Sequence, residues 1–463
     1  MVVEVAKQQR PSWGSLSSLP SDDAEPDRAY HAVLDWIWSF SARPRSPEDV
    51  SRQRAVKLER MYALLARLGH PEQSFPSVLV AGTKGKGSTV AMLSACLQAA
   101  GYRAGRYTSP HLWNWRERAC IDGDPISTDA VRSLSHPIRQ AIDQLPTSLG
   151  TPTTFEVGTA FALLHFARQR VDVAVLEIGT GGRFDATNLA ESVVSVIAPV
   201  SYDHTHTLGS SLTSIAWHKA GIIRPWRPVV TAAQPEEALV VIEAEAHQLA
   251  APLQEVGRDW RWSASGAGIS ISSDGAKVLE TEIGLLGDHQ RDNATTTVAT
   301  LNALSPRFRI STKAMQTGLK MVEWPGRLQV LSERPFVVVD GAHNAASAEV
   351  VRHALDNVFG FERLFLIVGL SEGKDALGVL HSLAPQASSV FLTRSRHERS
   401  LPPAELEPLA RAEAPSAQIA ALADVPSALE SALRIARPDD MILVTGSLFL
   451  VGEALLWWRR SRP

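Results

Sequence analysis

The segment 78–89, VLVAGTKGKGST, constrains this chain more than any other stretch of the sequence. Its first four residues form a short apolar run that predicts a buried strand, and apolar residues at helical spacing after Ser88 predict a helix. Between the two, glycines let successive backbone N–H groups converge on an anion, and a helix N-terminus favours negative charge. The segment therefore predicts a phosphate-binding loop, although an ordinary strand-to-helix turn in an α/β protein would also fit.

The side chains of this loop fit a nucleotide bound together with magnesium. Lys86 would reach the outer phosphates, and Ser88 or Thr89 would reach the Mg²⁺ ion. The spacing departs from the common G-x-x-x-x-G-K-[ST] pattern, because Gly87 separates the lysine from the hydroxyl group. The predicted nucleotide-binding residues of the loop are Gly85, Lys86, Gly87, Ser88 and Thr89.

Length and composition exclude several classes of protein. The chain has 463 residues, 44% of them hydrophobic, which is enough for two or three globular domains. A formal net charge of −3 argues against coating nucleic acid or an anionic membrane. Cys96 and Cys120 offer neither a disulfide framework nor metal-ligand spacing. The N-terminus lacks a signal-peptide core and no apolar run reaches transmembrane length, so we expect a cytoplasmic protein.

Strand and helix patterns alternate along the chain, which favours an α/β fold with parallel sheets. We predict a P-loop-type, doubly wound, mostly parallel sheet domain followed by a smaller Rossmann-like α/β domain. The predicted divisions are a disordered tail over 1–28, a nucleotide-binding domain over 29–304, a linker over 305–325 and a second domain over 326–463. The second domain has no glycine loop of its own, so we expect it to complete a site on the first.

Glu177 follows the predicted strand 171–176 and precedes a glycine-rich turn. In open α/β sheets, ligands gather at the carboxyl ends of the strands. A carboxylate in that place, beside a phosphate loop, can hold Mg²⁺, which prefers oxygen ligands. The alternative is a purely structural turn that is capped by Asp185.

Asp203 and His204 follow the next predicted strand, 193–197, which we expect to lie beside the strand that ends at Glu177. A histidine just past a strand end can bind a metal as neutral imidazole. A lone histidine in a loop is more often only a satisfied polar residue. The carboxylate of Asp203 and the position of Glu177 leave these two interpretations evenly matched.

Two further clusters have both a functional and a structural interpretation. Asp340 follows the predicted strand 336–339, with His343 and Asn344 on the next turn, and this cluster suits nucleotide hydroxyls or a reacting phosphate. The alternative is that Asn344 or Ser347 simply caps a helix that starts at Ala348. Lys219 lies near the end of a predicted helix, where the physical argument favours a surface lysine stabilised by the helix dipole.

Nine segments, taken in order along the chain, resemble the folylpolyglutamate synthase/dihydrofolate synthase family of Mur-type ATP-dependent amide ligases. They are VAGTKGKGST (80–89), YTSPHL (107–112), LEIGTGGRFDATN (176–188), DHT (203–205), KAGI (219–222), HQRDN (289–293), WPGR (324–327), DGAHN (340–344) and VTGSLFLVGE (444–453). The resemblance covers the chain from about residue 30 to residue 453. It implies an N-terminal ATP-binding domain of the Mur-ligase type and a C-terminal glutamate-ligase domain.

The resemblance implies an enzyme of folate biosynthesis and one-carbon metabolism, a carboxylate–amine ligase of the tetrahydrofolate synthase type. ATP phosphorylates a substrate carboxylate to an acyl phosphate, and the amino group of L-glutamate then attacks it and releases phosphate. Dihydropteroate, a reduced folate or both are the possible acceptors. We expect a cytoplasmic monomer that acts on small molecules and binds neither nucleic acid nor membrane.

The resemblance also assigns roles to individual residues. Lys219 matches a lysine that becomes N6-carboxylysine, an anion able to approach magnesium, and this replaces the surface interpretation. The remaining roles are metal ligation by Ser109, Glu177 and His204, ATP binding by Asn293, Arg327 and Asp340 together with the loop, pterin-side contacts by Thr153 and Asp185, and catalysis by Lys86, Lys219, Asp340, His343 and Ser447.

Two other functions remain to be weighed. A different Mur-type ligase, such as a cell-wall precursor enzyme, should lack the TSPHL segment at 108–112, which is present here. A guanine-specific nucleotide switch is expected to contain an Asn-Lys-x-Asp motif, and the sequence has none. Departures from the family pattern at Thr180, Phe184, His218 and Ala345 leave the choice of pterin substrate open.

Overall fold

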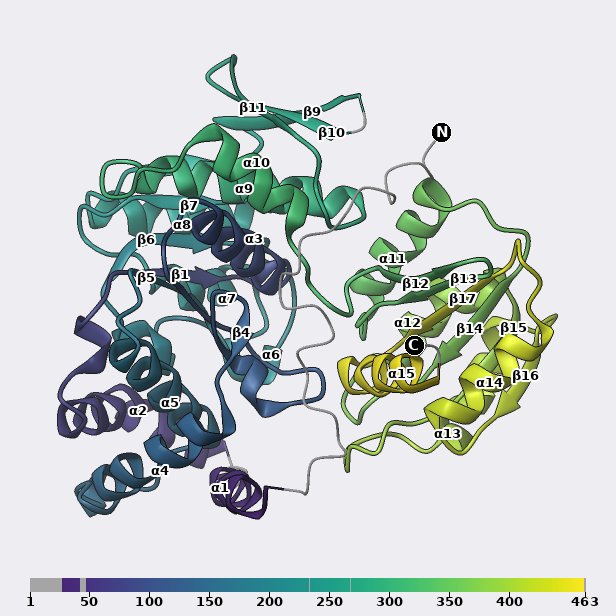
Figure 1. The fold of residues 1–463 in the computed structure, drawn as a ribbon, viewed down its shortest axis with the longest axis horizontal. Helices are drawn as coiled ribbons and strands as arrows, with labels where there is room; N and C mark the ends of the chain where they lie inside the picture. Colours follow the sequence, from purple (N-terminus) through teal and green to yellow (C-terminus); the bar gives the residue numbers. More distant parts are fainter. Residues whose placement is uncertain (1–26, 42–46, 233, 267, 462–463) are drawn as a thin grey trace.

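The computed structural model describes residues 27–41, 47–232, 234–266 and 268–461. The predicted tail over 1–28 therefore lies almost entirely outside the described residues, and its last residue, Arg28, already begins helix α1. The described chain folds into two lobes that are joined near residue 325 (Figure 1).

The first lobe is built on an eight-stranded sheet in the order β4-β3-β2-β5-β1-β6-β7-β8. In this order, the six strands β2, β5, β1, β6, β7 and β8 run parallel to one another, and β3 and β4 at the edge pair antiparallel. Their bounds are β1 Ser77–Ala81, β2 Ala104–Tyr107, β3 Ala119–Ile121, β4 Asp124–Pro125, β5 Val173–Glu177, β6 Ser192–Ile197, β7 Val229–Thr231 and β8 Leu253–Glu255.

Alternation along the central strand explains why helices cover both faces of this sheet. Leu79 and Ala81 of β1 pack into a core with helices α1, α2, α4 and α5, whereas Val78 and Val80 face α3, α9 and α10. The helices of this lobe are α1 Arg28–Trp38, α2 Pro47–Arg67, α3 Lys86–Ala99, α4 Thr128–Asp143, α5 Thr154–Arg168, α6 Thr205–Leu208, α7 Leu212–Ala220, α8 Glu236–Gln248, α9 Asp288–Leu304 and α10 Thr312–Met321.

A small antiparallel sheet projects from the first lobe (Figure 1). It consists of β9 Trp260–Ser265, β10 Gly268–Ser273 and β11 Ala276–Thr281. The short alternating segments of residues 257–283 predict such a ribbon, and the structure confirms it.

The second lobe holds a six-stranded sheet in the order β12-β13-β17-β14-β15-β16, in which β12 alone pairs antiparallel. Helices cover both of its faces, so the predicted α/β fold with two parallel sheets is confirmed. The elements are β12 Gln329–Glu333, β13 Phe336–Val339, β14 Leu364–Val368, β15 Ala387–Leu392, β16 Gln418–Ala421 and β17 Met441–Thr445, with α11 Ala345–Val358, α12 Ala376–Leu383, α13 Pro403–Glu413, α14 Val425–Ile435 and α15 Leu448–Ser461.

The expectation that the strands before Glu177 and His204 lie side by side is wrong. β1 lies between β5 and β6 and pairs with both, so the phosphate loop emerges between the two strand ends. Sequence order alone misleads here, because the crossovers place the earlier strand β1 in the middle of the sheet.

The range 305–325, predicted as a linker, contains α10. This helix packs tightly along α3, and the Sγ atom of Cys96 lies 3.6 Å from the backbone oxygen of Met315. We propose that the first domain extends to about residue 322 and that the true connection between the lobes is short. Within the described part of the chain, no helix combines the length and the apolar character that are needed to span a lipid bilayer.

Candidate active site

The glycine segment forms the predicted strand–turn–helix at the centre of the first sheet. β1 ends at Ala81, Gly85 adopts a left-handed conformation with φ of +77°, and α3 begins at Lys86. The N–H and the hydroxyl of Thr89 both donate to the carbonyl of Gly85, at 2.9 Å each. Because β1 is flanked by parallel strands, the loop lies at the carboxyl edge, where ligands of such sheets gather.

Asn293 of α9 lies against this loop. The Oδ1 atom of Asn293 lies beside Gly85, close enough to clash with any side chain at that position. Asn293 donates to Gln290 at 2.9 Å, and Gln290 in turn donates to the hydroxyl of Ser88 at 3.3 Å. The chain of bonds brings the predicted ATP residue Asn293 to the predicted loop. Gln290 is a site residue that sequence reasoning missed, although it lies inside the HQRDN segment.

Glu177, the last residue of β5, meets Ser109 and two positive charges. Its Oε2 atom accepts from the backbone N–H of Ser109 at 3.1 Å. Burial raises the pKa of the Glu177 carboxyl, and the nearby charges of Lys86 and Arg327 oppose that rise. Arg327 comes from the second lobe, so residues of both lobes act on this carboxylate. Ser109 and Glu177 supply oxygen atoms of the kind that Mg²⁺ prefers, so the pair fits that ion.

His204 lies beyond β6 with a left-handed φ of +50°. Its backbone N–H donates to Asp203 at 2.8 Å. Burial and the charges of nearby lysines, among them Lys86 and Lys219, lower the pKa of the His204 ring, which favours the neutral imidazole that binds metals. Among the described residues, no three or more His, Cys, Asp and Glu side chains form a group that could hold a metal.

Lys219 lies in the last turn of α7, as predicted, but the interpretation as a surface residue is wrong. Only 3% of the residue is exposed, and its Nζ atom donates to the carbonyl of Gly82 at 2.7 Å. Burial, reinforced by the charge of Lys86, lowers the pKa of Lys219 to about 7. The helix is buried because the glycine turn after Glu177 packs against its end, where Arg183 donates to the carbonyl of His218 at 2.7 Å.

In the second lobe, Asp340 follows β13 as predicted. Its two carboxylate oxygens accept from the N–H groups of Leu328 at 2.9 Å and Ala342 at 2.8 Å. Burial raises the pKa of Asp340, and the guanidinium of Arg327 opposes that rise. Asp340 therefore holds the turn that carries Arg327, which gives this predicted ATP residue a structural part as well.

His343, Asn344 and Ser447 extend this edge of the second sheet. The Nδ1 atom of His343 lies 2.9 Å from the carbonyl oxygen of Gly341, and burial lowers the pKa of the ring to about 4. Asn344 caps α11, which begins at residue 345 rather than 348, so the capping interpretation is confirmed for this residue. The hydroxyl of Ser447 accepts from Phe449 at 3.3 Å, just past β17, the strand paired with β13.

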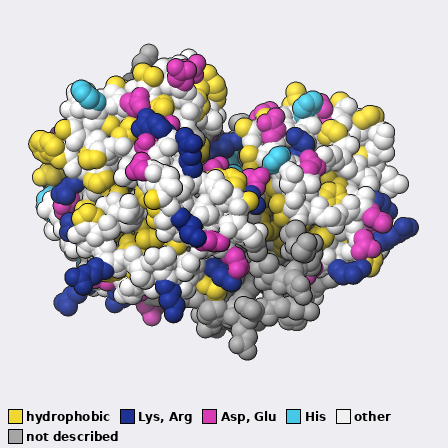
Figure 2. Space-filling view, turned by 90° about the horizontal axis from the view of Figure 1, so that it is seen from above, with side chains coloured by type: hydrophobic (Ala, Val, Ile, Leu, Met, Phe, Trp, Pro, Cys, Tyr) yellow, Lys and Arg dark blue, Asp and Glu magenta, His cyan; other side chains and the backbone are white. Residues whose placement is uncertain are grey.

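Several contacts connect the lobes around these residues. The Nζ atom of Lys84 in the phosphate loop lies 3.1 Å from Oδ1 of Asn344. The carbonyl of Leu112, three residues after Ser109, packs so closely on α15 that any side chain at Gly452 would strike it. Figure 2 shows the notch between the two lobes, with Lys, Arg and His side chains beside it. Sequence reasoning missed Lys84, although a second lysine within a glycine loop was a visible signal.

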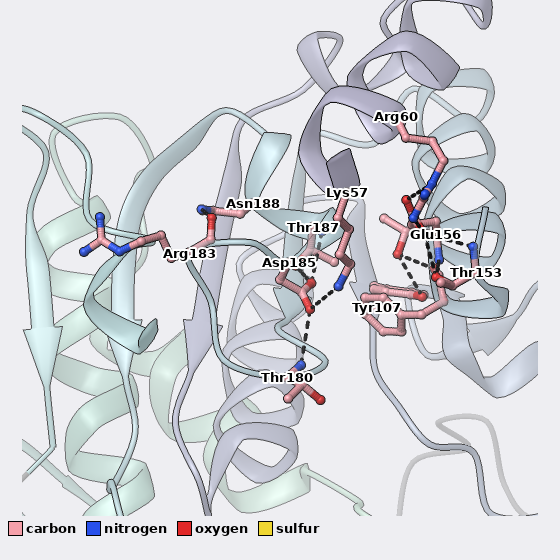
Figure 3. Close-up of polar contacts among 12 residues, drawn as sticks. Lys57, Arg60, Tyr107, Thr153, Glu156, Thr180, Arg183, Asp185, Thr187 and Asn188 are labelled. Carbon is pink, nitrogen blue, oxygen red and sulfur yellow. Dashed lines mark hydrogen bonds and ion pairs between the residues drawn. The ribbon is translucent and has the colours of Figure 1, made fainter. Parts of the chain in front are cut away.

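The two predicted pterin-side residues lie at the ends of neighbouring segments (Figure 3). Thr153 caps α5 and exchanges hydrogen bonds with Glu156, whose carboxylate pairs with Arg60. Asp185 accepts from Thr187 and Thr180. Asp185 caps the short 3-10 helix Ala186–Leu189, so the structural interpretation of this residue is confirmed, and its functional role stays a prediction.

Comparisons with known proteins all indicate one family of ligases. Residues 326–448 match the glutamate ligase domain of the Mur ligases. The chain is 34% identical over 413 residues to the dihydrofolate synthase/folylpolyglutamate synthase of Bacillus subtilis, which covers 86% of this chain and 93% of that protein. Among solved structures, Escherichia coli FolC in complex with DHPP and ADP superimposes with a TM-score of 0.82 at 29% identity, over 94% of this chain and 98% of that one.

A third comparison concerns the metal. The bifunctional folylpolyglutamate synthase/dihydrofolate synthase of Yersinia pestis, complexed with AMPPNP and a Mn ion, superimposes with a TM-score of 0.80 at 29% identity. It covers 92% of this chain and 97% of that chain. Both solved structures thus carry an adenine nucleotide, and the second also carries a divalent metal ion.

Proposed function

This chain belongs to the folylpolyglutamate synthase/dihydrofolate synthase family and is an ATP-dependent ligase, and we propose that it joins L-glutamate to its acceptor through an acyl phosphate at the junction of its two lobes. The observation that carries the proposal is the convergence on Glu177 of Lys86 from the phosphate loop and Arg327 from the second lobe. Phosphoryl transfer depends on positioning and charge neutralisation more than on covalent help from the protein.

The residues of the chain divide this work between the lobes. Lys86 and the N–H groups at the start of α3 neutralise and orient the outer phosphates, and Arg327 adds a second cation from across the junction. Asn293 and Asp340 position the nucleotide from either side. His343 and Ser447 lie at the strand ends of the second sheet, near the proposed position of the transferred phosphate and of the incoming L-glutamate.

Magnesium fits the Ser109–Glu177 pair, with His204 as a further ligand. When bound, Mg²⁺ neutralises charge on the phosphates and holds them in a fixed geometry. Lys219 supports this site best as an N6-carboxylysine. The low pKa of about 7 leaves a large share of its amine neutral at physiological pH, and only the neutral amine can react with carbon dioxide.

The acceptor is a folate or a dihydropteroate, with its pterin ring near Thr153 and Asp185 and its carboxylate toward the phosphate loop. Figure 3 shows the two residues on neighbouring segments. Glutamate as second substrate, a cytoplasmic location, a monomeric state and the lack of nucleic-acid or membrane partners remain predictions. A cell-wall precursor ligase and a non-catalytic switch are not favoured, because the relative from Bacillus subtilis and the solved structure from Yersinia pestis both carry the name of a dihydrofolate synthase/folylpolyglutamate synthase.

The test is a two-substrate assay with purified protein, ATP, Mg²⁺ and L-glutamate. Dihydropteroate and tetrahydrofolate are supplied separately, and both phosphate release and the glutamylated product are measured. We expect product from at least one acceptor, with one phosphate released for each amide formed, and no product when glutamate is omitted. Phosphate release without any glutamylated product from either acceptor would refute the proposal.

A further inference from the structure

Helix α2 presents two cations to two buried carboxylates of the first lobe. Lys57 and Arg60 are three residues apart and therefore lie on one face of the helix. Lys57 faces Asp185, and Arg60 faces Glu156 (Figure 3). The two ion pairs are neighbours, but their geometry differs, and the difference shows what each of them can do.

The Arg60–Glu156 pair is closed. The Nε and Nη2 atoms of Arg60 donate to the two carboxylate oxygens at 2.9 Å each, and the two side chains are 3% and 0% exposed. Glu156 also accepts from the N–H and the hydroxyl of Thr153, and Arg60 donates to the carbonyl of Leu149. This fork is a structural link between α2 and the start of α5, and the burial of both side chains keeps it out of reach of a ligand.

The Lys57–Asp185 pair is open. The Nζ atom of Lys57 lies 3.9 Å from Oδ2 of Asp185, which is beyond hydrogen-bond distance, and 23% of the lysine side chain but only 1% of the aspartate side chain is exposed. Asp185 uses Oδ1 for the N–H and the hydroxyl of Thr187, whereas Oδ2 accepts only the N–H of Thr180, at 3.2 Å. A carboxylate oxygen can accept two hydrogen bonds, so Oδ2 retains room for one more donor.

An aromatic ring lies beside this open pair. The Nζ atom of Lys57 is 5.8 Å from the centroid of the Phe155 ring. The same ring packs over the backbone of Gly179 so closely that any side chain there would clash with it. A flat apolar surface therefore adjoins an acceptor, the Oδ2 atom of Asp185, and a donor, the ammonium of Lys57. This combination suits a flat heterocycle whose edge carries a donor next to an acceptor.

The pyrimidine ring of a pterin has such an edge, because its N3–H and 2-amino donors adjoin the 4-oxo acceptor. We propose that Lys57 and Asp185 together recognise this edge, with Asp185 accepting from the ring nitrogen side and Lys57 donating to the 4-oxo oxygen. Lys57 is then a specificity-determining residue that selects 4-oxo over 4-amino pteridines. The inference rests on the proposed function, because it takes the Asp185 side of the lobe as the pterin end of the substrate.

A 4-amino pteridine would turn a donor toward the ammonium of Lys57. A site that is built to hydrogen-bond one group discriminates against an analogue that cannot complete the bond. A hydrogen bond to a charged group corresponds to a preference of about 10- to 100-fold. Removal of the charge should lower that preference by the part that Lys57 supplies, whereas a merely structural loss would lower the rates for both substrates alike.

The experiment measures kcat/KM for a matched pair of acceptors, 4-oxo and 4-amino, that share the same p-aminobenzoate tail and ring oxidation state. The pair is built on whichever acceptor, dihydropteroate or tetrahydrofolate, the wild-type enzyme glutamylates. Wild type should prefer the 4-oxo compound by about 10-fold or more. Lys57→Met should lower the ratio by about 10-fold, mainly through a higher KM for the 4-oxo compound, and Lys57→Arg should restore part of the preference.

Lys313→Met, at an exposed lysine of α10, is the matched control and should leave the ratio unchanged. An unchanged ratio in a folded Lys57→Met protein would overturn the inference, and so would the lack of any preference in the wild type. If Lys57→Met did not fold, Lys57→Gln and direct binding of the two acceptors to it without ATP would decide the question. A wild-type enzyme that glutamylates no 4-oxo acceptor would instead refute the proposed function, so the two failures are distinguishable.

Discussion

The Nζ atom of Lys84 lies 3.1 Å from the Oδ1 atom of Asn344, and this bond joins the phosphate loop of the first lobe to the helix cap of α11 in the second. Burial lowers the pKa of Lys84, while Asp203 and Glu349 hold it up. Asn344 keeps its capping bonds to Ser347 at the same time. Lys84, a cation of the phosphate loop, therefore belongs both to the predicted ligand site and to the junction of the lobes.

Lys84→Met should therefore weaken ATP binding without unfolding the protein. We expect KM for ATP to rise by roughly 10-fold, because a charge beside the phosphate loop is lost. The Asn344→Ser variant keeps a capping hydroxyl and serves as the partner in a double-mutant cycle. Strict additivity of the two substitutions in the ATP-binding free energy would contradict a direct link between these residues.

Lys86→Ala should abolish turnover and leave stability nearly unchanged. In the ligand-free protein the Nζ atom of Lys86 makes one long contact, 3.4 Å to the carbonyl of Thr83, so the fold depends little on it. Loss of a preorganised charge at the transferred phosphate should lower kcat by at least about 100-fold. Steady-state kinetics test the loss of turnover, and thermal unfolding tests the unchanged stability. Retained turnover in a folded variant would refute the assignment of this segment as a phosphate-binding loop.

Glu177→Gln should raise the Mg²⁺ concentration that is needed for half-maximal rate. Burial raises the pKa of this carboxyl, which means that the charged form is costly in the metal-free protein. The neutral amide should accordingly unfold at a higher temperature than the wild-type protein. A magnesium titration of the rate and a melting curve in EDTA measure the two effects. If only the glutamate requirement changed, the metal role of Glu177 would be wrong.

Lys219 should make activity depend on both carbon dioxide and pH. Its pKa of about 7 lies below the ordinary value of 10.5, so the unfolded chain binds more protons between these values. The penalty that this group imposes on stability is therefore fully present below pH 7 and disappears as pH rises from about 7 to 10.5. Removal of dissolved carbon dioxide should lower the rate, and bicarbonate should restore it.

Variants of Lys219 separate a carbamate from an ordinary cation. Lys219→Ala should lose most activity and regain part of it when a short carboxylic acid such as acetate occupies the vacated space. Lys219→Arg should not be rescued, because its fixed charge fills the same space. An arginine variant as active as the parent would show that no carbamate is needed.

The sequence predicts the parallel core well, because buried strands such as β1 and β14 are continuous apolar runs bounded by glycine and polar turns. It does not predict the short edge strands β12 and β16, whose half-exposed residues carry no clear alternation. The order of strands in the sheet cannot be predicted from the local pattern of residues either, because nothing in the residues of β6 indicates that β1 lies between it and β5.

For the site, residues inside glycine-rich motifs are predictable, because the backbone chemistry of a phosphate loop demands a particular local sequence. Lys57 and Arg60 are not predictable in this way. They lie on an amphipathic helix like many others, and only the tertiary packing of α2 against α5 and the Asp185 turn brings their charges to Glu156 and Asp185. Burial of Lys219 likewise depends on a segment more than thirty residues away in the sequence, which packs over the end of its helix.

The close packing of Leu112 on Gly452 couples metal binding in the first lobe to docking of the second lobe in one thermodynamic cycle. The segment that places Ser109 beside Glu177 is the same segment on which α15 of the second lobe rests (Figure 1). If a bound ion increases the equilibrium constant for docking of the lobes by some factor, docking increases the affinity for that ion by the same factor, because linkage is reciprocal. A substitution on α15, remote from every phosphate contact, is therefore expected to retune metal affinity.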